Sequence, residues 1–346
     1  MNFGMVRMLI LVAFWGLIGA GFGVAGTDRS VPSPRTITVA LDGSGDFSSI
    51  QEAVDSAGKG DSVFIKAGAY SQDLTIHSKE KIKIIGAGVD KVSLLGQGQM
   101  VGVLHVGKWP YGATDIEISG LTINEHGGHA LGVFNGNRIT LRRLHVKGMV
   151  FSQQVHDVRI EDCVIGGSET TGVHVSDSQA VLIGNVIHDN DHGVNVTGTS
   201  SVQLERNVIT RNLFEGVVIG DRARAVLINN TLVKNGGGGA FLGTSTIQAS
   251  GNILSFNKIG FLIAPSSQVN VAYNVLFNSE ANYMRAGSPN VPAPEFTVDS
   301  DIMADPRFVD AEHDDFHLQP DTTLVNLGGF RHLGALPPLS RTSKQQ

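Results

Sequence analysis

An internal repeat constrains this chain more than any other feature of its sequence. Asparagine recurs every 22 or 23 residues in the middle of the chain, at Asn185, Asn207, Asn230, Asn252 and Asn274. A second asparagine follows five residues after each of the first four, at Asn190, Asn212, Asn235 and Asn257. A period in the low twenties is typical of a solenoid, in which each repeat packs only against its neighbours. The sequence therefore predicts one elongated domain.

The residues around each asparagine alternate in a way that indicates β-strands. Apolar side chains lie five and three positions before the asparagine slot and two positions after it. Leucine-rich repeats have a similar period, but they need helical return segments, and the returns here are short and rich in Gly, Asn and Ser. We therefore expect an all-β, single-stranded parallel β-helix of about ten coils of ~22 residues. Its stacked asparagines are expected to hydrogen bond along the axis.

Composition limits the partners and the chemistry of the chain. The 346 residues are 41% hydrophobic and 17% charged, which excludes a mostly disordered chain. The net charge of −6 argues against a nucleic-acid partner. The one cysteine, Cys163, excludes an intrachain disulfide and a cysteine zinc cluster. Because Cys163 falls in a repeat slot, we expect it to be buried and inert.

The first 26 residues have the order of a cleavable secretory signal. Arg7 precedes an apolar run from Met8 to about Ile18, and small residues follow before the polar Thr27. The apolar run is short for a spanning helix, which needs about 20 residues, although an uncleaved anchor is the alternative. We therefore predict a signal peptide at 1–26, a secreted or periplasmic protein, and no stable membrane span after cleavage.

A solenoid must cover its open ends, and the sequence offers a segment for each. Residues 46–58 form the one clear amphipathic helix pattern, in which Ser48 and Gln51 can make a capping box. We expect this helix to cap the coil, so that cap and coil together span 37–290. Residues 291–336 are expected to be a C-terminal capping segment over the last coil, and 337–346 a flexible tail.

The N-terminal part of the repeat domain resembles a known group of proteins. The segments GSGDFSSIQEAVDSA (43–57) and GDSVFIKAGAY (60–70) look like the opening of pectin methylesterases, and more broadly the chain is similar to the pectin-lyase-like right-handed β-helix superfamily. This resemblance implies a right-handed coil that handles polysaccharide on its outer surface. The catalytic Asp and Arg segments of the methylesterases, QDT, DFIFG and GRPW, are absent, so methylesterase activity is not expected.

Candidate functional residues must point outward or lie in turns, because inward residues pack the core. Two positions after each turn glycine we expect an outward column, which reads His174, Asn195, Val218, Phe241 and Leu262. A lyase or C5-epimerase acting on uronates needs a base and cations that stabilise an enolate. The predicted catalytic residues are His174, His192, Arg211 and Glu215. The predicted substrate-binding residues are Asn195, Asp191 and Lys258.

Alternative interpretations of the same residues remain open. The turns of a soluble solenoid are polar in any case, since Asp, Asn and His favour turn conformations. No cofactor or metal is predicted, although Asp189, Asp191 and Glu215 could bind Ca²⁺. The apolar strip of Val218, Phe241 and Leu262 is expected to pack under the C-terminal segment.

Three function classes follow from the sequence. The first is an exported polysaccharide-active enzyme, of lyase or epimerase type. The second is a non-catalytic β-helix that binds glycan or serves as a surface or envelope spacer, which the aromatic content of only 6% favours. A periplasmic metal-maturation protein is a distant third, since the chain has 12 histidines but His126 and His129 form their one convincing pair.

Overall fold

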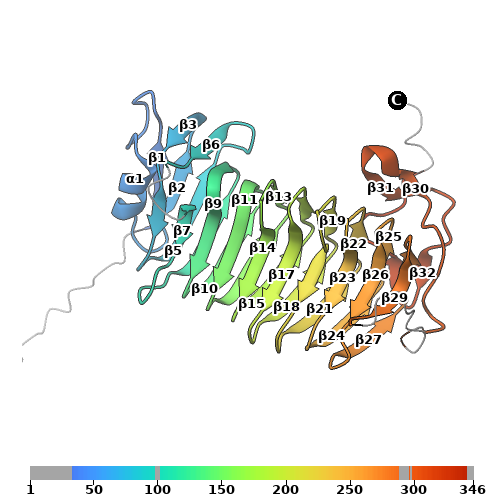
Figure 1. Cartoon of the computed structure of the whole chain (residues 1–346). Helices are drawn as coiled ribbons and strands as arrows, with labels where there is room; N and C mark the ends of the chain where they lie inside the picture. Colours follow the sequence, from blue (N-terminus) through green and yellow to red (C-terminus); the bar gives the residue numbers. More distant parts are fainter. Residues whose placement is uncertain (1–32, 98–101, 288–295, 297, 341–346) are drawn as a thin grey trace, which may run out of the picture. The chain divides into compact units, whose positions relative to one another are not determined.

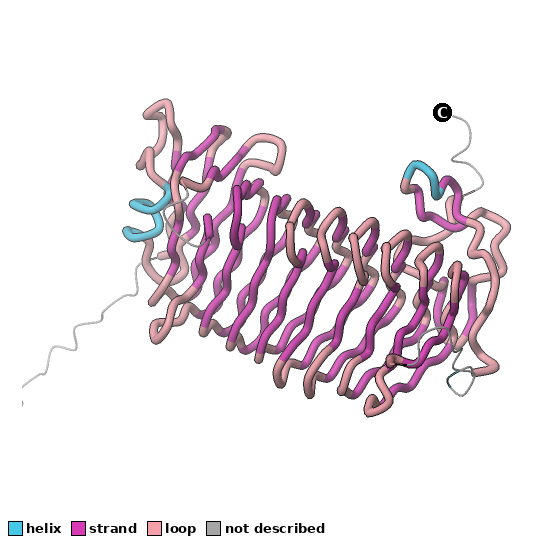
Figure 2. The backbone as a smooth tube through the Cα atoms, viewed as in Figure 1, coloured by secondary structure: helices cyan, strands magenta, loops and turns pink. Residues whose placement is uncertain are grey.

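A computed structural model describes residues 33–97, 102–287, 296 and 298–340. The predicted signal peptide and the end of the predicted tail lie outside these residues. The described residues from Pro34 onward form one compact unit, whose regular secondary structure is almost entirely β-strand (Figures 1 and 2). Within the described ranges no helix is both long and apolar enough to cross a bilayer.

The described chain winds into a parallel β-solenoid whose coils have three faces. The first face is a sheet of eleven parallel strands, so the solenoid has about eleven coils rather than the ten expected. These strands are β1 (Thr36–Val39), β2 (Ser62–Ile65), β5 (Glu80–Gly86), β8 (Thr114–Ser119), β10 (Asn137–Arg142), β12 (His156–Glu161), β15 (Gln179–Ile183), β18 (Ser201–Glu205), β21 (Arg224–Ile228), β24 (Thr246–Ser250) and β27 (Gln268–Ala272). The extra coil begins with β1, which pairs with β2 in parallel register.

The second and third faces follow in each coil, and two long strands run across both. The second face contains β3 (Gly68–Ser71), β6 (Val92–Leu95), β13 (Val164–Gly166), β16 (Val186–His188), β19 (Val208–Thr210), β22 (Thr231–Val233), β25 (Ile253–Ser255) and β28 (Val275–Phe277). The third face contains β4 (Leu74–Ile76), β7 (Gly102–Val106), β14 (Thr171–Ser176), β17 (His192–Thr197), β20 (Val217–Ile219), β23 (Gly238–Leu242), β26 (Ile259–Ile263) and β29 (Ala281–Arg285). Strands β9 (Thr122–Phe134) and β11 (His145–Gln153) contribute to both faces.

The core of the solenoid follows the alternation predicted from the repeat. The positions five and three residues before each slot, and two residues after it, are buried in the coils that begin with β8 to β24. Ile116, Ile118 and Ile123 show this in one coil. Equivalent residues stack in register between coils, for example Ile139 on Val158. Each coil therefore buries its apolar side chains against the coils before and after it, which is the main source of stability in a solenoid.

Two asparagine ladders run through this core. In the first, each side-chain amide from Asn185 to Asn252 donates from Nδ2 to Oδ1 of the next asparagine at 2.9–3.0 Å. The predicted second ladder, which begins at Asn190, continues beyond Asn257 to Asn278 and Asn282. The first-ladder asparagines are fully buried, and their amides pair with one another and with backbone groups, so the cost of burying them is offset.

The first ladder ends on a carboxylate. Asp301 Oδ1 accepts from both the backbone N and Nδ2 of Asn274, at 2.8 and 3.3 Å, and Tyr283 donates its hydroxyl to Oδ2. Burial raises the pKa of the Asp301 carboxyl. Asp301 thus takes the position that the next asparagine would occupy.

We expect the free energy of unfolding of the Asp301→Asn variant at pH 7 to equal or exceed that of the parent protein. The amide oxygen still accepts from Asn274, and Nδ2 of the asparagine can donate to the Tyr283 hydroxyl oxygen in place of the bond that Tyr283 donates to Asp301. The buried charge, whose ionisation opposes folding as the pH rises through its raised pKa, is gone. Asp301→Ala leaves two donors of Asn274 without an acceptor and is expected to cost about 1–3 kcal/mol. Urea unfolding of both variants measures the difference. Equal destabilisation by the two substitutions would contradict the assigned role.

The predicted N-terminal helix exists but is shorter than expected. Helix α1 spans Ile50–Ser56, and Ser49 rather than Ser48 is its N-cap, accepting from the backbone N of Glu52. Asp46 bonds instead to the backbone of Thr38, which keeps residues before Ser49 out of the helix. Gln51 bonds to both backbone groups of Thr75 on the edge strand β4. These contacts agree with a capping role, which stays a prediction.

The C-terminal segment packs along one side of the solenoid. It contains β30 (Phe308–Asp310), the short 3₁₀ helix η2 (Ala311–His313), β31 (Asp315–Leu318), β32 (Val325–Leu327) and β33 (Phe330–His332). Phe308, Phe316, Leu318, Leu324, Leu333 and Ala335 form a second apolar cluster with Val208, Val233, Ile253 and Val275 of the second face. The segment thus covers β19, β22, β25 and β28. Val218, Phe241 and Leu262, on which the segment was expected to pack, belong to the third face and are not part of this cluster, so that expectation stays a prediction.

Candidate functional site

The third face presents the predicted outward column in register. His174 on β14 pairs with Asn195 on β17, which pairs with Val218, and the column continues through Phe241 and Leu262. Each of these side chains is partly exposed, whereas both neighbours of His174, Val173 and Val175, are buried. Toward the N-terminus the same column continues through Phe151. The strand pattern of the repeat therefore placed these side chains correctly.

Aromatic and imidazole rings lie side by side on β9, β11 and β14. The ring of Phe151 stacks on His129 with centroids 4.9 Å apart and meets His174 edge-on at 5.2 Å. Phe134 contacts the same phenyl ring at 5.6 Å. We call these four residues the ring cluster. Rings of this kind offer a flat, partly apolar surface with polar edges.

His174 is the most chemically distinct member of the ring cluster. Its Nε2 lies 3.1 Å from the hydroxyl oxygen of Thr197 on the next coil. Burial, with a smaller contribution from His129, lowers the pKa of His174. The imidazole is therefore neutral near pH 7, which is the form that can accept a proton.

His192 lies apart from His174, although both are on the third face. His192 pairs in register with Thr171, three residues before His174, so the two backbones are offset by roughly 10 Å along the strands. Its Nδ1 lies 3.2 Å from Glu215 Oε2 but is not aligned for a hydrogen bond, and its ring packs on Phe214 at 5.2 Å. The predicted His192 and Glu215 thus come together, and His174 does not join them.

Arg211 is held in a separate ion-pair cluster. Its guanidinium binds both oxygens of Asp189, at 2.9 and 2.8 Å, and also pairs with Asp314 of the C-terminal segment. The pKa of Asp189 falls to about 2, mainly because Arg211 donates to it. Lys234 lies 3.4 Å from Asp314 and lies over the ring of Phe316. Arg211 therefore fastens the C-terminal segment to the coil, and its side-chain partners are Asp189, His188 and Asp314.

The predicted binding residues are dispersed. Asn195 neighbours His174, and its Oδ1 is buried with no hydrogen-bond partner among the described residues. Asp191 lines a shallow pocket with Glu169 and Arg211. Lys258 lies 3.3 Å from Glu280. Within the part of the chain that the structure describes, no three His, Cys, Asp or Glu side chains are grouped so that they could hold a metal ion, so the calcium alternative at Asp189, Asp191 and Glu215 has no support.

Cys163 has the position expected from the repeat. It is buried, and its backbone N donates to Oδ1 of Asn185, so it occupies the slot just before the first ladder. Burial raises the pKa of its thiol to about 12. A thiol in this environment is not a nucleophile at neutral pH.

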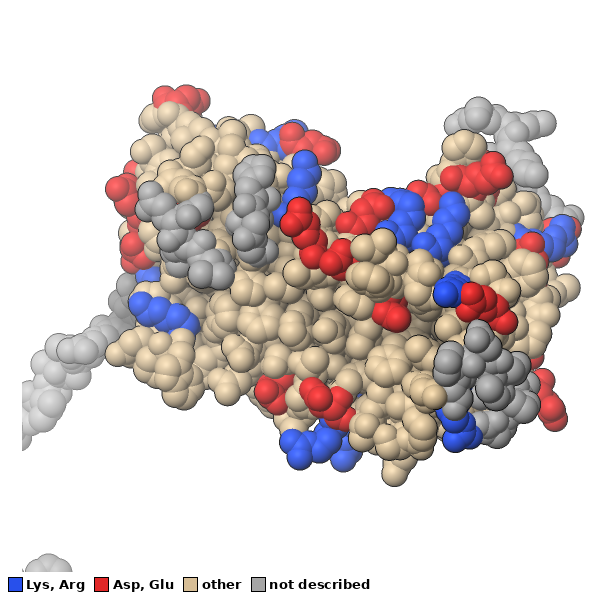
Figure 3. All heavy atoms as spheres, viewed as in Figure 1, with Lys and Arg blue, Asp and Glu red and all other residues tan. Residues whose placement is uncertain are grey.

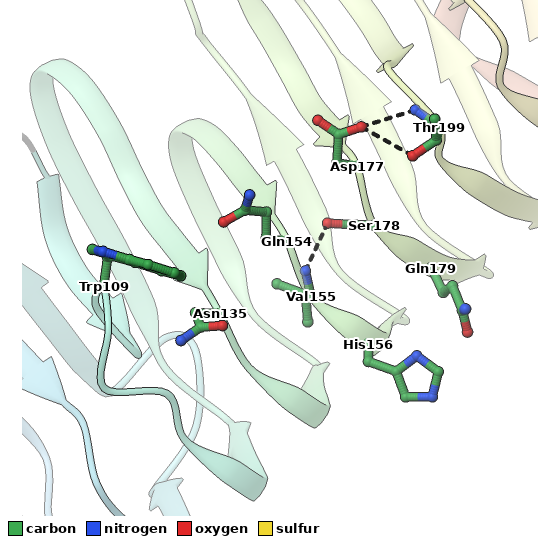
Figure 4. A pocket seen from close by; sticks show the side chains of 9 residues that line it. All are labelled: Trp109, Asn135, Gln154, Val155, His156, Asp177, Ser178, Gln179 and Thr199. Atoms are coloured by element: carbon green, nitrogen blue, oxygen red, sulfur yellow. Dashed lines mark hydrogen bonds between the residues drawn. The ribbon is translucent and has the colours of Figure 1, made fainter.

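Sequence reasoning missed a pocket at the turns that follow the third-face strands. The pocket has a volume of about 470 Å³, and residues of five successive coils line it, from Trp109 to Thr199 (Figure 4). Trp109 is 75% exposed. It lies in a loop outside the asparagine repeat, so the periodicity carried no information about it, although an isolated Trp in a Gly-rich loop was a usable signal.

Charge is sparse on the described part of the third face. The outward column from Phe151 to Leu262 contains no Asp, Glu, Lys or Arg, and neither does the neighbouring column of Phe134, Gln153, Ser176 and Thr197. Figure 3 shows charged side chains gathered along the borders of the visible surface and a broad area with few charges between them. This surface is suited to an uncharged ligand.

Known proteins share this architecture. Residues 147–291 match the family model described as "Right handed beta helix region". The A-modules of two mannuronan C-5 epimerases of Azotobacter vinelandii, AlgE4 and AlgE6, are similar in structure, with TM-scores of 0.56 and 0.57 at 20% and 16% identity. Both matches cover 68% of this chain, and 73% and 71% of the modules.

A third solved structure belongs to a protein of another kind. PfbA, a surface adhesin of Streptococcus pneumoniae, has a TM-score of 0.51 at 14% identity, over 68% of this chain and 78% of the adhesin. No curated protein matches the chain in sequence. At these identities the similarities establish the fold.

Proposed function

Because this chain has the right-handed β-helix fold of the pectin-lyase-like superfamily, we propose that it is an exported protein that binds polysaccharide on its third face. The ring cluster is the observation that carries this proposal. Phe151 and His174 present adjacent rings on successive coils, and Asn195 and Thr197 add polar groups one coil further on. A coil spacing of about 4.8 Å places these groups within reach of adjacent sugar residues of one chain.

Two of the similar structures support a ligand of this class. They are epimerases of mannuronan, a polysaccharide, and they share the solenoid fold. The adhesin supports the alternative of a non-catalytic surface protein. Export rests on the signal-like segment 1–26. The proposal also includes a capped repeat domain at 37–290, a C-terminal capping segment at 291–336 and a flexible tail at 337–346.

Calorimetric titration of the chain from residue 27 with neutral and uronate polysaccharides tests the proposal. We expect Phe151→Ala to weaken binding about tenfold, since a lost ring contact is worth roughly 1–1.5 kcal/mol. Phe277→Ala is the matched control, because Phe277 is 42% exposed on the second face. Absence of binding to every polysaccharide, or equal losses in the two variants, would refute the proposed surface.

A catalytic role, as a uronate lyase or C5-epimerase, is the second candidate. The lowered pKa of His174 favours it, because a neutral imidazole can take the proton next to a carboxylate. The ion pairs of Arg211 weigh against it, since that cation is already engaged by Asp189 and Asp314. Lyase products absorb in the ultraviolet, and epimerised products are resolved by NMR. The His174→Ala variant should abolish either signal.

A further inference from the structure

The pocket beside Trp109 has features of a sugar site that the ring cluster lacks. Its volume of about 470 Å³ falls within the usual range of small-ligand sites, about 300–1,000 Å³. One wall is the indole of Trp109, and the others carry amide, hydroxyl, imidazole and carboxylate groups of Asn135, Gln154, His156, Asp177 and Thr199. A flat apolar ring beside several convergent polar groups is the arrangement that orients a polar ligand.

Exposed Trp109 lies in a loop that hydrogen bonds hold in place. Asn135 Nδ2 donates to the carbonyl of Pro110 at 2.9 Å, and Lys108 N donates to the carbonyl of Tyr111 at 2.8 Å. The first bond holds the loop on the neighbouring coil and the second closes the loop on itself, and Figure 4 shows the indole of Trp109 beside Asn135. A large aromatic side chain that is 75% exposed leaves apolar area in water, which contact with a ligand would remove.

Asp177 supplies the most specific polar group in the pocket. Its Oδ1 accepts from the backbone N and the hydroxyl of Thr199, at 2.9 and 3.1 Å. In Figure 4 the other oxygen points away from Thr199, toward the side of the pocket that holds Gln154 and Trp109. Hydrogen bonds from Thr199 lower the pKa of Asp177, so the carboxylate is ionised at neutral pH and can accept hydrogen bonds from ligand hydroxyls.

Charge decides which sugars fit this pocket. Asp177 is the one carboxylate in the pocket lining, and the lining contains no Lys or Arg. A uronate carboxylate would face this negative charge with no cation in the lining to balance it, since Arg222, which acts on Asp177 by charge, is not among the lining residues. We infer that the Trp109 pocket is a subsite for a neutral sugar residue, which stacks on the indole and donates hydroxyls to Asp177.

The subsite adjoins the proposed binding face. Asp177 directly follows strand β14 and is three residues from His174, roughly 10 Å along the chain. A glycan that lies over the ring cluster can therefore continue into the pocket. The inference rests on the proposed function, since it names the sugar class and the second point of attachment.

Fluorescence of the full chain tests the subsite. The sequence has two tryptophans, Trp15 and Trp109, so Trp15→Phe leaves Trp109 as the single reporter. Cellohexaose and mannohexaose are the neutral probes, and hexagalacturonate and hexamannuronate are the acidic probes. We expect the neutral probes to shift the emission of Trp109 to shorter wavelength, and Trp109→Ala to weaken their binding about tenfold in calorimetry. Tyr111→Ala, which changes a 57% exposed ring of the same loop outside the pocket, should leave binding unchanged.

A second variant tests the charge argument. Asp177→Asn keeps an acceptor for Thr199 and removes the negative charge, so we expect the preference for neutral over acidic probes to fall about fivefold or more. Calorimetric binding of neutral probes that leaves Trp109 emission unchanged would overturn the subsite while the proposed function stands. Tighter binding of the acidic probes through Trp109 would overturn the sugar class. No heat with any probe would reject both.

Discussion

Replacing Asn230 with alanine is expected to lower the free energy of unfolding by about 2–6 kcal/mol. Asn230 is fully buried, and its Oδ1 accepts from both the backbone N and Nδ2 of Asn207, at 3.0 and 2.9 Å. Its own Nδ2 donates to Leu204 O and to Asn252 Oδ1. Alanine removes these partners at once, and each buried polar group left unpaired costs about 1–3 kcal/mol.

The matched control for this variant is Asn270→Ala. Asn270 is an exposed asparagine on β27, and its removal should change stability by less than about 0.5 kcal/mol. Guanidinium unfolding followed by far-ultraviolet circular dichroism measures both values. If the two variants unfold at the same denaturant concentration, the ladder does not stabilise the solenoid.

Phe316→Ala is expected to release the C-terminal segment from the second face. Phe316 is 2% exposed, packs on Phe308 at 5.4 Å and lies under the ammonium group of Lys234. Truncating a buried Phe to alanine costs about 3–5 kcal/mol. Because the segment packs on the outside of the coils, this loss should appear as local opening and not as unfolding of the whole solenoid.

Hydrogen exchange measured by mass spectrometry separates these two outcomes. Faster exchange is expected in residues 305–336 and on strands β19, β22 and β25, which the segment covers, with no change on the first face. Tyr111→Ala serves as the control, since Tyr111 is 57% exposed and lies in the loop after β7, on the N-terminal coils. Uniform acceleration along the whole chain would show that the segment and the coils unfold as one unit.

Much of the fold could be predicted because the same strand pattern recurs in many coils. Strand periodicity and the 22-residue spacing located the core, the ladders and the outward column that contains His174 and Asn195. The first coil was missed because β1 lies before the helix and has no asparagine slot. The start of α1 was displaced because Asp46 and Ser48 are also good capping residues, and it is the bonds of Asp46 and Phe47 to β1 that keep this stretch out of the helix.

The site was harder to predict than the fold, because its contacts join distant parts of the chain. Arg211 pairs with Asp314, 103 residues away, in a segment without repeats. No local pattern could reveal that this cation is engaged. The Trp109 pocket likewise brings together a loop and turns that span about 90 residues of sequence. Such contacts depend on how coils stack, which periodicity locates only for residues inside the repeat.

The asparagine ladder also bears on how a chain of this kind changes length during evolution. Every coil from Asn185 to Asn252 offers the same amide donor to the coil after it and the same acceptor to the coil before it. Duplicating or deleting one period between two slots therefore joins surfaces that already match. Asp301 and the segment behind it would remain the terminus of a shorter or longer protein. The length of the third face can thus change to suit longer or shorter glycans while the packing of the core stays the same.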